Sequence, residues 1–230
     1  MTDLRAVIDR FAKPLAEQRK LSTHQYKVLR DLLACRTDAL GGHANTCLGC
    51  GNLSIAYNSC RNRHCPLSQS FKREVWQMDR MADLLNIHYF HLVFTVPDQL
   101  NSLIYHNQNL LYSLLFSSAV AALQQLAKNP KRLSAQLGLT GILHTWGQTL
   151  SYHPHVHFIV PGGGWCEKTQ RFIPSKKKYL FPVKVISRVF RAIFLKELAF
   201  LVSQGKIING KSGETVQKKA LKPLFDELIE

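Results

Sequence analysis

Four of the six cysteines lie in one short stretch of the chain, and this crowding constrains the fold more than any other feature. Cys47 and Cys50 form a C-x2-C pair, and Cys60 and Cys65 follow as a C-x4-C pair. Glycines and asparagines surround both pairs, so the backbone can wrap around a small tetrahedral site. Thiolate is the ligand that zinc prefers in structural sites, and unrelated free cysteines would not concentrate in this way. We therefore predict a loop-built knob at residues 41–66 that holds zinc through these four cysteines.

The zinc ligand set has two open points. His43 or His64 could replace Cys60, and each would need a hydrogen-bond acceptor to fix its tautomer. A second C-x2-C motif would place a cysteine three residues after Cys65, but Ser68 stands there, and a hydroxyl is a poor zinc ligand. The other two cysteines are interpreted as ordinary buried thiols: Cys35 and Cys166.

The charge balance predicts a polyanionic partner. Thirty Lys and Arg against 15 Asp and Glu give a formal net charge of +15 at pH 7. On a chain of 230 residues, such an excess indicates phosphate contacts and counterion release, with an anionic membrane as the weaker alternative. Basic residues beside the knob predict a DNA clamp: Arg61, Arg63, Lys72 and Arg73. A second basic edge is predicted on a later helix: Lys184, Arg188 and Arg191.

Neither an export signal nor a membrane span is predicted. Residues 1–20 alternate charged and apolar side chains, unlike a signal peptide. The longest uncharged apolar run, residues 110–123, is shorter than the roughly 20 residues that a bilayer needs, so it is interpreted as a buried helix. We expect a soluble chain in the cytoplasm, without membrane contact. The cytoplasm is a reducing compartment, in which cysteines stay free or bind metal.

The order of the predicted elements indicates an α+β fold. Helical spacing of apolar residues predicts two short helices over residues 4–35, broken near Pro14 and at residues 21–23. The elements predicted after the knob are, in order, a helix at 70–86, a strand at 88–96, a helix at 101–128, strands at 141–150, 155–160 and 171–173, and a helix at 183–202. This order fits a ferredoxin-like antiparallel sheet covered by helices. We expect a zinc-binding, DNA-binding module at 1–86 and a second domain at 87–230.

Histidines alternate along the strand that begins near residue 153. In a strand, His153, His155 and His157 project to the same face, where neighbouring imidazoles can share a divalent cation. Solvated histidines on a polar strand face are the minority alternative. Such a metal would polarise a scissile phosphate while a separate nucleophile, such as a tyrosine, attacks in line. A third ligand is also needed, and the candidates are Gln148, His91 and His153.

Several blocks of the sequence together resemble a known family. The blocks are Cys35-Arg36-Thr37 with Gly41-Gly42-His43, then Tyr57 to Pro66, Tyr89 to Pro97, and His153 to Gly164. In this order they are similar to the rolling-circle transposases of the insertion sequence ninety-one family, a two-tyrosine branch of the HUH endonucleases. The resemblance implies a structural Zn²⁺ module and an HUH nuclease domain. It also implies that His155 and His157 are catalytic ligands of Mg²⁺ or Mn²⁺, which serve to nick and rejoin single-stranded DNA at insertion-sequence ends near the bacterial nucleoid.

Two positions depart from the family pattern. The family usually has Cys where Ser68 stands, and its catalytic tyrosines lie in a Tyr-x3-Tyr block that this sequence does not match. That block would follow Glu230, so a C-terminally truncated family member is expected. Tyr179, the one tyrosine after the histidine strand, lies in a basic segment and is interpreted as a DNA contact that stacks on a base.

Three functions are compared on these grounds. The first is a transposase that nicks and rejoins single-stranded DNA by a metal-assisted tyrosine mechanism. The second is a non-catalytic, zinc-dependent DNA-binding remnant or inhibitor of the full-length enzyme, which would form no covalent adduct. The third, a metallohydrolase of small substrates, fits the +15 charge poorly. The sequence leaves open whether the chain forms a homo-oligomer.

Overall fold

The computed structural model describes residues 4–175, 180–210 and 212–216, so the predicted DNA contact Tyr179 lies outside the described residues. The chain divides into two compact units, Met1–Leu84 and Leu85–Glu230. This division lies close to the boundary that the sequence analysis places after residue 86.

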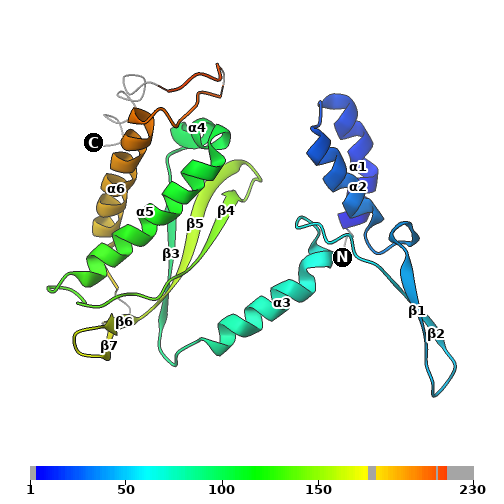
Figure 1. The fold of residues 1–230 in the computed structure, drawn as a ribbon, viewed down its shortest axis with the longest axis horizontal. Helices are drawn as coiled ribbons and strands as arrows, with labels where there is room; N and C mark the ends of the chain where they lie inside the picture. Colours follow the sequence, from blue (N-terminus) through cyan, green and yellow to red (C-terminus); the bar gives the residue numbers. More distant parts are fainter. Residues whose placement is uncertain (1–3, 176–179, 211, 217–230) are drawn as a thin grey trace. The chain divides into compact units, whose positions relative to one another are not determined.

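The described part of the first unit has three α-helices, a short 3-10 helix (Asp38–Leu40) and one β-hairpin (Figure 1). Its elements are α1 (Leu4–Gln18), α2 (Thr23–Ala34), β1 (Gly42–Thr46), β2 (Leu53–Tyr57) and α3 (Pro66–Ala82). The predicted break before α2 is confirmed, because Ser22 and Gln25 form a capping box at its start. The predicted break near Pro14 is wrong, since α1 continues through this residue. Arg10, whose carbonyl the proline leaves unpaired, is exposed, so water can satisfy it.

The knob contains a regular hairpin where the sequence predicts only loop. β1 and β2 are antiparallel, with Gly42 opposite Tyr57 and Thr46 opposite Leu53. All residues of both strands are exposed. β1 lacks the apolar alternation from which a strand is predicted, whereas β2 has it at Leu53, Ile55 and Tyr57, a signal that the loop prediction did not use.

The second unit is built on a three-stranded antiparallel sheet in the order β3-β5-β4 (Figure 1). The strands are β3 (Tyr89–Thr95), β4 (Thr140–Trp146) and β5 (Tyr152–Pro161); β6 (Gly163–Cys166) and β7 (Arg171–Pro174) pair separately. Its described helices are a short 3-10 helix (Asp98–Leu100) and the α-helices α4 (Asn101–His106), α5 (Gln108–Lys128) and α6 (Val183–Ser203). The predicted α+β class is confirmed, and within the described ranges the main sheet has three strands.

Alternate residues of β5 form the centre of the hydrophobic core. Val156, Phe158 and Val160 are fully buried under α5 and α6. The ring of Phe158 contacts that of Phe116 on α5, with centroids 5.1 Å apart. Gly141 on β4 lies opposite Phe158, and a Cβ there would come within 2.6 Å of both rings. This position therefore requires glycine.

The apolar run at residues 110–123 is a buried core helix, as predicted. α5 has 21 residues and is apolar enough to cross a bilayer by length and composition alone. Nine of its residues are buried, and it packs against the sheet and α6.

The long helix predicted at 101–128 is divided at Asn107. Its side-chain amide donates to the carbonyls of Leu103 and Ile208, and its side-chain oxygen accepts from the Ile208 amide. These bonds join two segments that are distant in the sequence. The backbone at Asn107 leaves helical geometry to make them, with φ −127°.

The Phe158→Ala substitution should lower the free energy of unfolding by about 3–5 kcal/mol, because it removes a fully buried ring and leaves a cavity. Urea denaturation measures this change. The matched control is Ile159→Ala, next along the strand and half exposed on the opposite face, which should cost about 1 kcal/mol or less. Equal losses for the two variants would contradict the assignment of the core face.

Candidate metal centres

The histidines of β5 lie on the face of the sheet that α5 and α6 do not cover. His155 and His157 alternate with Val156 and Phe158, which point into the core. On β4, His144 is directly opposite His155. Potential ligand nitrogens of His144, His155 and His157 all lie within 4.8 Å of one another. The sheet thus gathers three imidazoles at one point.

Hydrogen bonds leave one ring nitrogen of His155 and one of His157 available to a cation. His155 Nδ1 lies 2.7 Å from the backbone carbonyl of His153. Because a carbonyl only accepts, Nδ1 carries the proton and the Nε2 lone pair is free. His157 Nδ1 lies 2.8 Å from His91 Nε2, and His157 Nε2 is buried without a hydrogen-bond partner among the described residues. Such an orphaned nitrogen fits a metal ligand.

His144 is the third member of this cluster, and neither His91 nor His153, two of the predicted third ligands, belongs to it. His91 hydrogen-bonds to the Nδ1 of His157 and so holds the ring of this candidate ligand in place. His153 lies 3.4 Å from the carboxylate of Asp98, and Gln148 lies in the turn between β4 and β5. Sequence reasoning missed His144 because its position depends on the register of two strands. The sequence signal that could have indicated it is the alternation of Ile142, His144 and Trp146, which places these side chains on one face of β4.

The electrostatic setting keeps His157 neutral. Burial lowers its pKa below the ordinary value, and positive charge on His144, His155 and His91 would lower it further. The neutral imidazole is the form that binds a metal. Near neutral pH, His157 is therefore in the form that can bind a cation.

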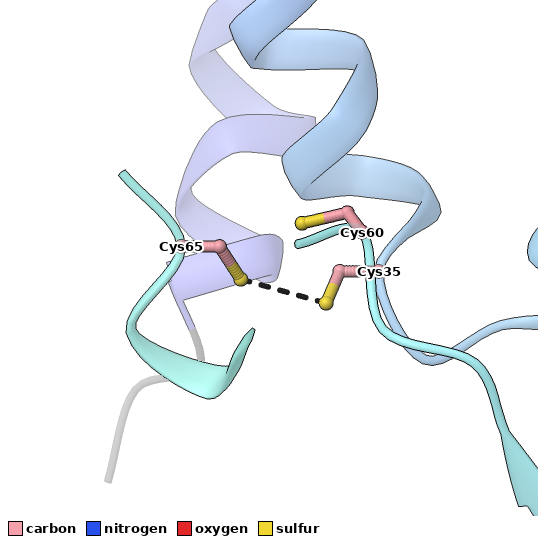
Figure 2. Close-up of side chains that lie close together, drawn as sticks. All are labelled: Cys35, Cys60 and Cys65. Carbon is pink, nitrogen blue, oxygen red and sulfur yellow. Dashed lines mark hydrogen bonds between the residues drawn. The ribbon is translucent and has the colours of Figure 1, made fainter. Parts of the chain in front are cut away.

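A second cluster lies in the first unit, where the sulfurs of Cys35, Cys60 and Cys65 point toward one another (Figure 2). All three sulfurs lie within 4.8 Å of one another, and Cys35 Sγ and Cys65 Sγ are 3.4 Å apart. This geometry fits a thiolate-bound zinc, with Cys35 at the end of α2 and Cys65 at the start of α3. The interpretation of Cys35 as an ordinary buried thiol is therefore corrected, whereas Cys166 is simply buried in β6, as predicted.

The thiols of this cluster differ in acidity. Burial raises the pKa of Cys60. Burial also acts to raise the pKa of Cys65, but hydrogen bonds from the Ser68 hydroxyl and amide outweigh it and lower the pKa. Of these two thiols, Cys65 therefore ionises more readily than Cys60.

Cys47 and Cys50 lie outside this cluster, at the tip of the β1–β2 hairpin (Figure 1). Both are exposed, and the backbone amide of Gly49 lowers the pKa of Cys47. The four cysteines predicted as one ligand set therefore form two separate pairs, because the hairpin carries its tip away from the helix ends. His43 on β1 and His64 are exposed and also lie outside the cluster.

The predicted DNA contacts of the first unit are all exposed, whereas those of the second unit differ in exposure. A hollow of about 400 Å³ beside the cysteine cluster is lined by several basic side chains: Arg36, Arg61 and Lys72. Arg63 and Arg73 are also exposed. On α6, Lys184 and Arg188 are exposed, whereas Arg191 is half buried beside Phe190.

Comparison with known proteins places both units among transposases. A family profile described as "Transposase zinc-binding domain" matches residues 7–96, and one described as "Putative transposase" matches residues 138–227. The chain is 45% identical over 192 residues to "Putative transposase y4qJ" of Sinorhizobium fredii (strain NBRC 101917 / NGR234). This match covers 84% of this chain and 48% of the relative. It is 33% identical over 156 residues to "Transposase for insertion sequence element IS801" of Pseudomonas savastanoi pv. phaseolicola, covering 67% of this chain and 37% of the relative. The chain thus spans about half the length of these relatives or less, and no solved structure matches it.

Acidification should destabilise the metal-free protein through His157. Its folded pKa lies below the unfolded value of about 6.5, so the unfolded state binds more protons between these two values. The free energy of unfolding should therefore fall as the pH drops from 7.5 through 6.5 toward the folded pKa. Urea denaturation across this range in EDTA measures the slope. His157→Gln should flatten it, and an unchanged slope would count against burial of a neutral His157.

Proposed function

Because this chain belongs to the insertion sequence ninety-one family of transposases, we propose that it binds single-stranded DNA at the ends of a mobile element and supplies the metal site for nicking and rejoining that DNA. One observation carries the proposal. Three imidazoles converge on the open face of the sheet, and two of them have a ring nitrogen free to bind a cation.

In this proposal the metal is held by His144, His155 and His157. When bound, the cation polarises a scissile phosphate and neutralises the charge that develops during cleavage. The resemblance to the family implies Mg²⁺ or Mn²⁺, and imidazole donors favour Mn²⁺ of the two, because Mg²⁺ prefers oxygen ligands.

The remaining histidines hold the ligands in position. The His153 carbonyl fixes the tautomer of His155, and the hydrogen bond to His91 orients the ring of His157. If His157 ligates through Nε2, its Nδ1 carries the proton and donates to His91 Nε2. The two rings are stacked nearly parallel, with an interplanar angle of 10°.

Tyr152, although it directly precedes the histidines, is not the nucleophile in this proposal. It lies on the covered side of the sheet, where its hydroxyl is 2.9 Å from that of Tyr112. Burial and this hydrogen bond raise its pKa. A phenol that resists ionisation attacks phosphorus poorly. The covalent step therefore needs a different tyrosine.

The first unit, in this proposal, is a zinc-held DNA clamp. Its exposed basic side chains border the hollow beside the cysteine cluster. Metal-bound thiolates would hold the ends of α2 and α3 together, and so would keep the basic residues at fixed separations along a phosphate backbone.

The His144→Ala variant should lose at least about 100-fold in Mn²⁺ affinity, because removing a direct ligand costs more than removing its hydrogen-bond partner. Titration calorimetry on the full chain measures the affinity. His153→Ala is the matched control. It lies on the same face of β5 outside the cluster, and its backbone carbonyl still accepts from His155, so affinity should stay close to wild type. The reverse order of effects would refute His144 as the third ligand.

The nuclease proposal itself is tested with a labelled single-stranded oligonucleotide from an element end, with and without Mn²⁺. A cut oligonucleotide or a denaturation-resistant protein–DNA band, dependent on Mn²⁺ and absent from a His155→Ala/His157→Ala variant, supports a nuclease. Binding without either product at any tested sequence supports the alternative, a non-catalytic DNA-binding protein.

Replacing Lys72 and Arg73 by alanine should weaken binding to single-stranded DNA regardless of sequence. Each lost phosphate contact should lower the slope of log affinity against log salt by about 0.7. Fluorescence anisotropy from 50 to 300 mM salt, about a sixfold range, measures both quantities. The control is Arg80→Ala on the same helix, whose guanidinium already pairs with Asp83 at 3.0 Å. An equal effect of the control would argue against a localised clamp.

A further inference from the structure

Ser68 lies against the cysteine cluster, in the first turn of α3. Its Oγ is 3.4 Å from Cys35 Sγ and 3.2 Å from Cys60 Sγ. A tetrahedral zinc with sulfur at about 2.3 Å and oxygen at about 2.1 Å has sulfur and oxygen vertices about 3.6 Å apart. The hydroxyl thus stands close to where the fourth vertex of a site made by Cys35, Cys60 and Cys65 would lie.

The backbone around the cluster independently indicates a built site. Arg36 and Arg61 each follow a cluster cysteine directly, and both adopt left-handed backbone geometry, with φ 56° and 54°. Residues with a Cβ disfavour this geometry, and it persists where the surrounding structure demands it. The Arg61 amide donates to Ser68 Oγ at 3.2 Å, so one of these turns orients the hydroxyl.

We propose that Cys35, Cys60 and Cys65 bind zinc with Ser68 Oγ at the fourth position, so that the site is one thiolate short of a closed structural site. The proposal rests on the zinc-binding role of the first unit and goes beyond it by assigning the ligands. A neutral hydroxyl binds zinc more weakly than a thiolate. The fourth ligand is therefore exchangeable.

The surface beside Ser68 gives an outside ligand access to this position. Ser68 is half buried and lines the hollow of about 400 Å³ together with Arg61 and Lys72. The basic walls favour an anionic ligand, and zinc favours a soft one. A small thiol, bound as thiolate, meets both conditions and would displace the hydroxyl.

Cobalt replaces zinc in such sites and reports the number of thiolates through its sulfur-to-metal charge-transfer absorption. The full chain is titrated with Co²⁺ in a Cys47→Ser/Cys50→Ser background, so that the hairpin thiols do not contribute. We expect one tetrahedral Co²⁺ with three-thiolate intensity. Cys35→Ser should remove about a third of this intensity, whereas Ser68→Cys should add about a third and raise affinity at least about tenfold in competition with a chelator. Adding 2-mercaptoethanol should change the spectrum of the background protein and not that of its Ser68→Cys derivative.

Three outcomes would overturn the assignment. Loss of Co²⁺ binding in the background would make the hairpin cysteines ligands of this site. An unchanged intensity in the Cys35→Ser variant would exclude Cys35. An unchanged intensity in a folded Ser68→Cys variant, judged by circular dichroism, would remove Ser68 from the fourth position. Ser68→Ala is the second variant, and it should keep the three-thiolate intensity and bind Co²⁺ more weakly. If the wild-type chain itself binds neither Co²⁺ nor Zn²⁺, the zinc role fails, which is a result distinct from a wrong ligand set.

Discussion

The alternation of β5 is the constraint on which the second unit depends. One set of its side chains, centred on Phe158, fills the core under two helices, and the other set presents His155 and His157 on the open face. Because side chains in a strand alternate strictly, a shift of one residue in its pairing would exchange the two sets. The apolar core thus fixes the register, and the register places His144 opposite His155. Burial of hydrophobic surface on one side is what positions the imidazoles on the other.

Much of this arrangement could be predicted from the sequence, because it follows from local periodicity. The alternation at His153–Val160, the apolar run of α5 and the crowded cysteines are readable without a structure. The hairpin at residues 42–57 was missed because β1 has no apolar alternation and the alternation in β2 was not used, and the division at Asn107 was missed because its cause is a hydrogen bond to Ile208. These features depend on burial or on partners that lie elsewhere in the chain.

The two candidate sites show the same limit. Sequence spacing identified Cys60 and Cys65 but could not reveal that Cys35, 30 residues before Cys65, packs against them. It likewise identified His155 and His157 and missed His144. In each cluster the candidate ligands that are close in sequence were found, and the one contributed by a neighbouring element was not. In both clusters, tertiary contact decides the third candidate ligand.

Arg61 has two separate roles, one through its side chain and one through its backbone. Its side chain faces the basic hollow, while its backbone holds a left-handed turn directly after Cys60 and donates to Ser68. Glycine would adopt the left-handed backbone conformation without strain and would remove the charge, whereas lysine would keep the charge and have the same conformational cost as arginine. Glutamine would remove the charge and leave the conformational cost in place, but no residue keeps the charge and also relieves the cost, because only glycine adopts left-handed geometry freely. A positive charge at this position is therefore always accompanied by a disfavoured backbone conformation.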